Sequence, residues 1–221
     1  MTTRQLTVNC PSWSSDGPAS REGSFRKSCE NAYRAVEATA LNKIADAQDC
    51  QDWHYTMFSS HVPLDYYAGN FRQVDASRPC LQVNVEVEGV AGESPECVPL
   101  EVNNVFDLLR RNLASLERLW PQLTAAERAR RLAIVLGTVI GRFIQIHPFI
   151  NGNGRTSRLL WAWGLMRFGI PPQIRIRQHP ENPKYDFVMA KAMQGDFDHL
   201  SLFILGHLTM NAPGMPPPPK S

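Results

Sequence analysis

The chain has 221 residues, of which 43% are hydrophobic and 20% charged, and its formal net charge is +2. This composition predicts one globular domain with a substantial core, and the small net charge gives no reason to expect nucleic acid or a membrane as a partner. No segment is apolar enough to span a bilayer, because Arg142 and His147 interrupt the most apolar run, Leu132 to Phe149.

The cysteines are widely spaced and form no Cys-x-x-Cys pair: Cys10, Cys29, Cys50, Cys80 and Cys97. An odd number with such spacing argues against a zinc site or a disulfide framework, so we expect five isolated thiols. A reducing cytoplasm suits such a chain best. Secretion as an effector is the alternative localisation.

The two ends of the chain have the composition of low-order segments. Residues 1–27 are polar, without the apolar core of a signal peptide, and predict a flexible leader. Residues 212–221 are rich in proline and predict an extended or disordered tail. The folded domain is therefore expected to span residues 28–211, beginning with an alanine-rich helix from Ser28 to about Asp49.

The segment from Leu81 to Glu88 alternates apolar and polar residues without a break, which is the period of a strand. Gly89 and Gly92 follow it and supply turn residues. We therefore predict a β-hairpin arm that stands on an otherwise helical body.

Helical patterns follow the arm. Apolar residues at helical spacing predict a helix from Glu101 to Trp120. Thr124 and Glu127 have the form of a capping box, which would open a long helix that ends near Ile146. That helix is apolar on almost all sides toward its end, as expected at the centre of a bundle. Further helices are predicted over three ranges: Thr156 to Phe168, Tyr185 to Met193 and Leu200 to Met210.

The segment His147-Pro-Phe-Ile-Asn-Gly-Asn-Gly-Arg-Thr-Ser-Arg158 combines the residue types that phosphoryl chemistry needs. Its turn contains Gly152 and Gly154 and would present unpaired backbone N–H groups at the positive end of the following helix. Arg155 and Arg158 lie one helical turn apart and can face the same polyanion. His147 can accept a proton at neutral pH. Together these residues suggest the transfer of a phosphorus group.

This segment resembles the signature of Fic domains, His-x-Phe-x-(Asp/Glu)-Gly-Asn-Gly-Arg-x-x-Arg. Every fixed position matches except the acidic one, where the chain has Asn151. Residues 53–58 and 65–72 resemble the family's helix and its Ala-Gly-x-(Tyr/Phe/Trp)-Arg element. The similarity extends over roughly residues 51–208. It implies an all-α Fic fold, a helical bundle with a short β-hairpin flap.

The resemblance implies a role for each motif residue. His147 would take the proton of a target Ser, Thr or Tyr hydroxyl that attacks the α-phosphorus of ATP, with Asn153 and Arg155 completing the catalytic set. The acidic position would bind Mg²⁺, and Asn151 would do so weakly because an amide oxygen carries no charge. Five residues would bind the phosphates of the nucleotide: Gly152, Asn153, Gly154, Arg155 and Arg158.

Two further expectations come from the family. A target protein would bind along the flap, at Val83, Asn84 and Val85, where an exposed edge allows a peptide to add as a strand. Many members also carry a glutamate that pairs with the second motif arginine and blocks the nucleotide. Glu30 is the first candidate here and Glu22 the second, although neither has a Ser or Thr four residues earlier. A separate inhibitory protein is the alternative.

The leading function is therefore the transfer of AMP from ATP, with Mg²⁺, to a hydroxyl of a target protein. One alternative is a transferase of the same fold that uses another nucleotide or a phosphocholine donor. A second alternative is a catalytically weak, nucleotide-binding regulator. Removal of AMP from a modified protein, with a glutamate such as Glu30, is a third.

Overall fold

The structure, a computed structural model, describes residues 9–14, 21–172, 174, 176 and 183–211. The predicted proline-rich tail, 212–221, lies outside the described residues. The described part forms one two-stranded sheet and the following helices: α1 (Glu22–Thr39), α2 (Ala47–Phe58), α3 (Val98–Leu119), α4 (Ala125–Ile146), α5 (Asn153–Arg167), α6 (Pro183–Met193) and α7 (Asp198–Asn211).

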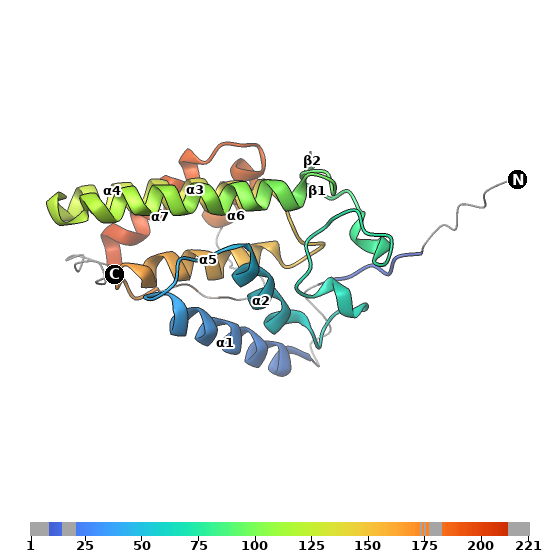
Figure 1. The fold of residues 1–221 in the computed structure, drawn as a ribbon. Helices are drawn as coiled ribbons and strands as arrows, with labels where there is room; N and C mark the ends of the chain where they lie inside the picture. The colour runs from blue at the N-terminus through green and yellow to red at the C-terminus, as the bar shows by residue number, and fades with distance from the viewer. Residues whose placement is uncertain (1–8, 15–20, 173, 175, 177–182, 212–221) are drawn as a thin grey trace, which may run out of the picture.

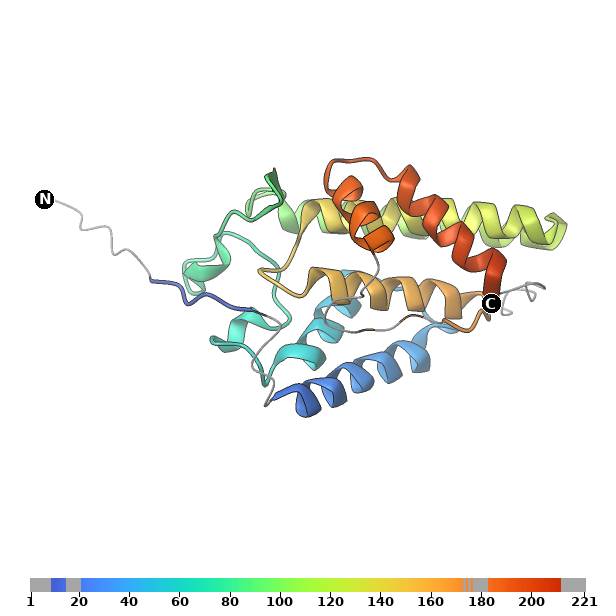
Figure 2. The same cartoon turned by 180° about the vertical axis from the view of Figure 1, so that it is seen from behind.

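The helices are arranged around α4. Helices α3, α5, α6 and α7 all contact it, and α5 also contacts α1 and α2 on its other side. Figures 1 and 2 show the result, with α5 lying between α4 and the pair formed by α1 and α2. The expectation that the helix ending near Ile146 is central is therefore confirmed.

The start of α4 is the predicted capping box. Thr124 Oγ1 accepts a hydrogen bond from the Glu127 N–H at 3.3 Å, and Glu127 Oε2 accepts one from the Thr124 N–H at 2.8 Å. Farther along, Gly137 lies so close to α7 that an added Cβ would be 2.2 Å from Ser201 Oγ. The absence of a side chain at this position therefore allows α4 and α7 to pack closely.

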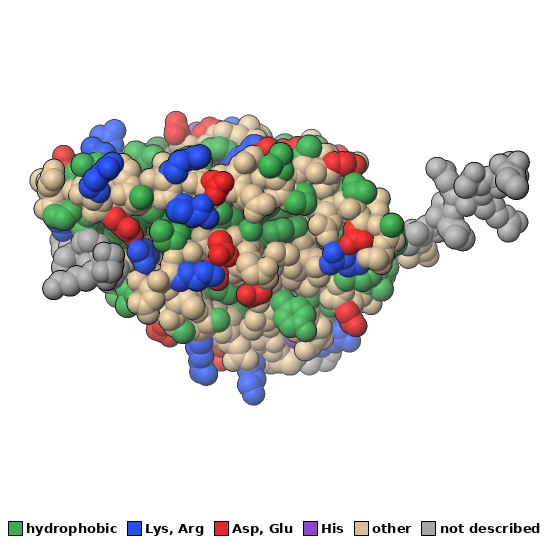
Figure 3. Space-filling model, viewed as in Figure 1, with side chains coloured by type: hydrophobic (Ala, Val, Ile, Leu, Met, Phe, Trp, Pro, Cys, Tyr) green, Lys and Arg blue, Asp and Glu red, His purple; other side chains and the backbone are tan. Residues whose placement is uncertain are grey.

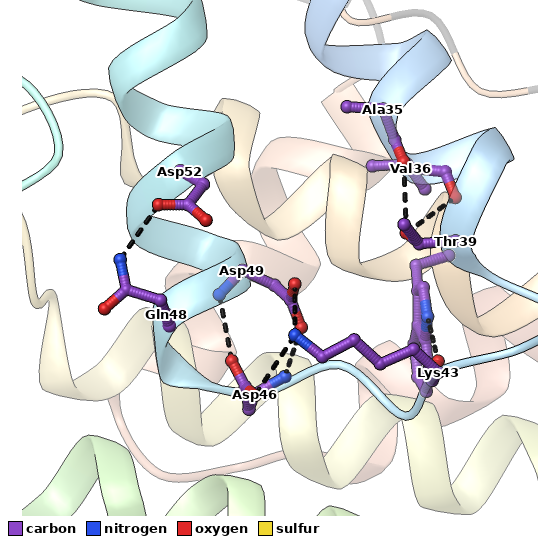
Figure 4. Close-up of polar contacts among 9 residues, drawn as sticks. Ala35, Val36, Thr39, Lys43, Asp46, Gln48, Asp49 and Asp52 are labelled. Carbon is purple, nitrogen blue, oxygen red and sulfur yellow. Dashed lines mark hydrogen bonds and ion pairs between the residues drawn. The ribbon is translucent and has the colours of Figure 1, made fainter.

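The predicted helix from Ser28 to about Asp49 is two helices, and this expectation is wrong. Residues 40–46 separate α1 from α2. The Asp46 side chain accepts from the Asp49 N–H at 3.0 Å, while the Asp49 side chain accepts from the Asp46 N–H at 2.9 Å. Lys43 pairs with both carboxylates (Figure 4). A second capping box therefore starts α2 inside a stretch whose alanine content suggested continuity.

The predicted leader, residues 1–27, is also wrong in part. Helix α1 begins at Glu22, and its residues Cys29, Ala32 and Val36 form an apolar stripe that packs into the core. Residues 9–14 contact the folded domain as well, as described below. The folded region therefore begins well before residue 28.

The β-hairpin is present but shorter than predicted. Strand β1 (Glu86–Val87) pairs antiparallel with β2 (Val90–Ala91), and the turn between them has φ values of 51° at Glu88 and 81° at Gly89. The start of the predicted strand is instead a 3₁₀ turn, Pro79–Leu81. Residues 82–85 have no strand partner in the described part of the chain. Alternation alone therefore overestimated the length of the strand.

Cys10 and Cys80 form a disulfide, with their Cα atoms 5.5 Å apart. The expectation of five isolated thiols is therefore wrong for this pair and confirmed for Cys29, Cys50 and Cys97. Disulfides persist mainly in oxidising compartments, so the cysteines no longer argue for a reducing cytoplasm. In the described part of the chain, no helix has the length and apolar character needed to cross a membrane.

Candidate active site between α4 and α5

The candidate base ends α4. His147 adopts the left-handed conformation, with φ 54°, and its N–H donates to the Phe143 carbonyl at 3.1 Å. Burial, helped by the positive charge of Arg72, lowers the pKa of His147 to about 4. The imidazole is therefore neutral at pH 7, which is the form that can accept a proton.

Arg72 holds the end of α4 against the flap. Its side chain is fully buried and donates to four backbone carbonyls: His147 and Ile146 at 2.9 Å, Val83 at 3.0 Å and Glu93 at 2.8 Å. Burial lowers the pKa of Arg72 to about 10, so it stays charged at pH 7. The sequence does not predict these hydrogen bonds, although Arg72 is the last residue of the Ala-Gly-x-x-Arg element that resembles the family.

His54 supports the turn from α2. Its ring stacks on Phe149, with centroids 3.8 Å apart and planes 9° apart. Its Nδ1 accepts from the Gly69 N–H at 2.9 Å, so Nε2 carries the proton and donates to the Asn151 carbonyl at 2.9 Å. Burial lowers the pKa of His54 to about 3, which keeps the ring neutral. His54 therefore has a structural role, which is to hold the turn.

Asn153 braces the turn instead of facing outward. Its Oδ1 accepts from the Phe149 N–H at 2.9 Å, and its Nδ2 donates to the Phe149 carbonyl at 2.8 Å. The Phe149 ring itself is fully buried and anchors the turn in the core. The side chain of Asn153 is thus committed to holding the loop, which leaves its backbone N–H to meet a ligand.

Two backbone N–H groups at the start of α5 are available to an anion. The Gly152 N–H donates to Asn151 Oδ1 at 2.7 Å, and the Arg155 N–H donates to the Gly152 carbonyl at 3.1 Å. The N–H groups of Asn153 and Gly154 have no partner among the described residues. They lie at the positive end of the helix dipole, which favours a phosphate.

The two motif glycines have different tasks. Gly152 has φ 82°, and an added Cβ would lie 2.5 Å from the Phe58 ring and 2.9 Å from His54 Nε2, so this position must stay small to pack on α2. At Gly154 the nearest atom to an added Cβ would be Arg158 Nη1, at 3.7 Å. Gly154 therefore faces open space beside a guanidinium group.

This difference predicts opposite outcomes for two alanine variants. Gly154→Ala should fold as stably as the parent protein but bind ATP more weakly, because its methyl group enters the space beside Arg158. Gly152→Ala should lower the free energy of unfolding by about 2 kcal/mol or more, from left-handed strain and overpacking. Thermal unfolding and ATP titration measure both effects. Unchanged ATP affinity in Gly154→Ala would contradict a phosphate site at this turn.

The two motif arginines are buried at the start of α5, between α1 and α6. Arg155 Cζ lies 4.8 Å from the ring centroid of Phe25 on α1, and Arg158 Cζ lies 5.8 Å from that of Tyr185 on α6. Both arginines are near Cys29 of α1 and oppose the rise of its pKa, although burial still raises that pKa to about 11. Cys29 is therefore a protonated core residue at pH 7.

The predicted inhibitory glutamates do not reach these arginines. The Glu30 side chain is exposed and pairs with Arg26 at 3.5 Å, and Glu22 is exposed at the start of α1. Helix α1 instead turns Phe25 and Cys29 toward the motif. The expected glutamate–arginine lock is therefore absent among the described residues, because the helix presents another face. Control by a separate inhibitory protein stays a prediction.

Asn151 is engaged at both ends of its amide. Oδ1 accepts from the Gly152 N–H, as above, and Nδ2 donates to the Trp13 carbonyl at 2.9 Å. No group of three or more His, Cys, Asp or Glu residues suitable for a metal occurs in the described ranges. An amide oxygen that already accepts a hydrogen bond does not fit the role of a Mg²⁺ ligand in this arrangement.

The flap residues lie close to the candidate base. Gly92 fits between Val85 and His147, since an added Cβ there would be 2.9 Å from Val85 Cγ2 and 3.0 Å from His147 Cβ. The Val85 carbonyl accepts from the Gly92 N–H at 3.0 Å. Val83 and Val85 are half-buried while Asn84 between them is exposed. The predicted target-binding segment therefore runs next to His147.

The sequence profile of the Fic/DOC family matches residues 44–165. One stretch of 63 residues is 46% identical to the protein adenylyltransferase Fic of Drosophila erecta, and the match to the same-named protein of Drosophila virilis is 44% identical over 63 residues. These matches cover 28% of this chain and only 12% and 13% of the two fly proteins.

A solved structure has a similar fold. It is a Fic domain containing signaling protein from Bacteroides thetaiotaomicron, with a TM-score of 0.59 and 18% sequence identity, and the match covers 88% of this chain and 73% of that one. At this level of identity the similarity concerns the fold and not the activity. The predicted helical bundle with a short β-hairpin is thereby confirmed.

Proposed function

Because the chain belongs to the Fic/DOC family, we propose that it transfers AMP from ATP to a hydroxyl of a target protein. The observation that carries this proposal is the arrangement at the turn between α4 and α5. A neutral imidazole stands at one end of the turn, and two backbone N–H groups and two arginines stand at the other. This set suits attack on a phosphorus atom by a hydroxyl.

In the proposed reaction, the target hydroxyl oxygen attacks the α-phosphorus and its proton passes to His147. A new oxygen–phosphorus bond forms, the bond from the α-phosphorus to the bridging oxygen breaks, and pyrophosphate leaves. The N–H groups of Asn153 and Gly154 would stabilise the charge that develops on the phosphoryl oxygens. Arg155 and Arg158 would hold the outer phosphates.

The nucleotide would carry Mg²⁺ mainly on its own phosphates. Asn151, at the family's acidic position, does not fit as a ligand while both ends of its amide are engaged. The target would lie along Val83, Asn84 and Val85, which brings its hydroxyl toward His147. The short separation of Val85 and His147 across Gly92 supports this placement.

A transferase with a different donor is the second candidate, and the engaged amide of Asn151 favours it. A donor such as CDP-choline carries less negative charge than ATP and therefore depends less on a metal ligand from the protein. If ATP binds but no group is transferred, the protein would instead be a nucleotide-binding regulator with weak activity.

The donor is tested by incubating the purified protein with Mg²⁺ and either ATP, GTP, UTP or CDP-choline. Intact-mass spectrometry then detects self-modification, and labelled donors detect modified proteins in a lysate. We expect the mass of one AMP to be added with ATP and no addition with the other donors. Addition of phosphocholine, or of another nucleotide in preference to AMP, would replace the leading proposal by the second candidate.

A further inference from the structure

Residues 9–14, which we call the strap, lie against the loop between α2 and α3 (Figures 1 and 2). The disulfide joins Cys10 to Cys80, which is buried in that loop. Tyr67, from the same loop, donates its hydroxyl to the Pro11 carbonyl at 3.2 Å. A covalent bond and a hydrogen bond therefore fix the strap to the folded domain.

Trp13 brings the strap to the motif turn. Its ring centroid lies 5.2 Å from that of Phe58 and 6.0 Å from that of His54, both on α2. Its backbone carbonyl accepts a hydrogen bond from Asn151 Nδ2 at 2.9 Å. The strap thus provides a fixed acceptor for the side chain of the one motif residue that departs from the family signature.

Asn151 is held at three points. His54 Nε2 donates to its backbone carbonyl at 2.9 Å, its Nδ2 donates to the Trp13 carbonyl, and its Oδ1 accepts from the Gly152 N–H at 2.7 Å. Because a carbonyl only accepts and an N–H only donates, the side chain needs a donor at one end and an acceptor at the other. An ionised Asp or Glu has no donor. The amide at residue 151 therefore suits both of its partners at once.

The hydrogen bond from Gly152 to Asn151 controls the backbone that follows. Gly152 has φ 82°, and glycine restricts its own dihedral angles less than any other residue does. The next two N–H groups, of Asn153 and Gly154, have no partner among the described residues. Fixing the peptide group before Gly152 therefore limits the directions in which these two N–H groups can point.

Surface charge gives the site little help on the face seen in Figure 3. Lys and Arg side chains are intermixed there with Asp and Glu side chains over the described residues. The net charge of the chain is only +2, so long-range attraction of a polyanion is weak. Phosphate binding should therefore depend on the local geometry of the motif turn.

We propose that Asn151 is a positioning residue of the phosphate site: anchored on the strap carbonyl, it holds Gly152 so that the N–H groups of Asn153 and Gly154 converge on a phosphate group. The binding of phosphate at these N–H groups rests on the proposed function, whereas the hydrogen bonds of Asn151 do not. Residue 151 thus serves the phosphate site through backbone geometry and not as a metal ligand.

Asn151→Leu tests this inference, because leucine keeps a branched side chain but has neither donor nor acceptor. The probe is inorganic pyrophosphate, titrated by calorimetry once in EDTA and once with Mg²⁺, after thermal unfolding has shown that the variant is folded. We expect the affinity to fall roughly ten-fold in both titrations, as for the loss of about one hydrogen bond. Asn103→Leu is the matched control, because Asn103 is exposed on α3, and it should bind as the parent protein does.

Asn151→Asp separates the two ends of the amide. The carboxylate can still accept from the Gly152 N–H, but it faces the Trp13 carbonyl with a negative charge and no donor. We expect exchange of the Gly152 N–H, measured by NMR, to become roughly ten-fold faster, because repulsion by that carbonyl turns the side chain away. Unchanged or slower exchange would show that the strap carbonyl does not orient residue 151, and it would overturn the inference.

The pyrophosphate titrations distinguish the inference from the proposed function. Equal affinity of Asn151→Leu and the parent protein would overturn the inference and leave the proposed function standing. A loss of affinity only with Mg²⁺ would make residue 151 a metal ligand and would also overturn it. The expected loss, with no AMP transfer in any form, would support the inference and remove the proposed function. A parent protein that binds neither pyrophosphate nor ATP would overturn both.

Discussion

Replacing His147 by alanine is expected to lower the rate of AMP transfer by about 10²–10⁴-fold, the usual contribution of a positioned general base. The affinity for ATP should stay close to that of the parent protein, because the N–H groups of Asn153 and Gly154 and both motif arginines remain. Single-turnover transfer and ATP titration measure the two quantities separately. His199→Ala is the matched control, since His199 is an exposed histidine that pairs with Asp196 on the surface.

The pH profile of the parent protein tests the same assignment. Burial and Arg72 lower the pKa of His147 to about 4, so the base stays neutral well below pH 7. The transfer rate should therefore be flat from about pH 8 to about pH 5 and fall as the pH approaches 4. A transfer rate that falls as the pH drops through 6.5 would instead indicate a solvent-exposed histidine as the base. If the profile is flat and His147→Ala retains full activity, His147 is not the base.

Replacing Arg72 by alanine is expected to lower the free energy of unfolding by about 4 kcal/mol, because four buried or half-buried backbone carbonyls lose a charged donor together. The affected carbonyls belong to the end of α4 and to both sides of the flap. The substitution should therefore also loosen the position of His147 and slow transfer in any protein that remains folded. Denaturant unfolding gives the stability change.

Two variants sharpen this prediction. Arg72→Lys keeps the charge, but a single ammonium group lacks the planar fork that reaches four carbonyls, so an intermediate loss is expected. Arg110→Ala removes an exposed arginine that pairs with Asp107 and should change stability by less than about 0.5 kcal/mol. If Arg72→Ala were destabilised no more than Arg110→Ala, Arg72 would not hold the end of α4 against the flap.

The sequence by itself determined the features that depend on neighbouring residues. The Thr124–Glu127 capping box and the apolar surface of α4 predicted the central helix, because caps and helical periodicity act within a few residues of the chain. The motif from His147 to Arg158 indicated the family because its residues are contiguous in the sequence. The Asp46–Asp49 capping box is a local pattern of the same kind, and it predicts the break between α1 and α2.

Tertiary structure alone decided which side chains meet. It brought Cys10 to Cys80 across 70 positions, and it joined Asn151 to the Trp13 carbonyl. It also turned Glu30 toward solvent and buried Arg72 under the flap. None of these contacts follows from composition, periodicity or spacing, because a hydrogen bond or a disulfide forms only where the packing of distant helices and loops places both partners within reach.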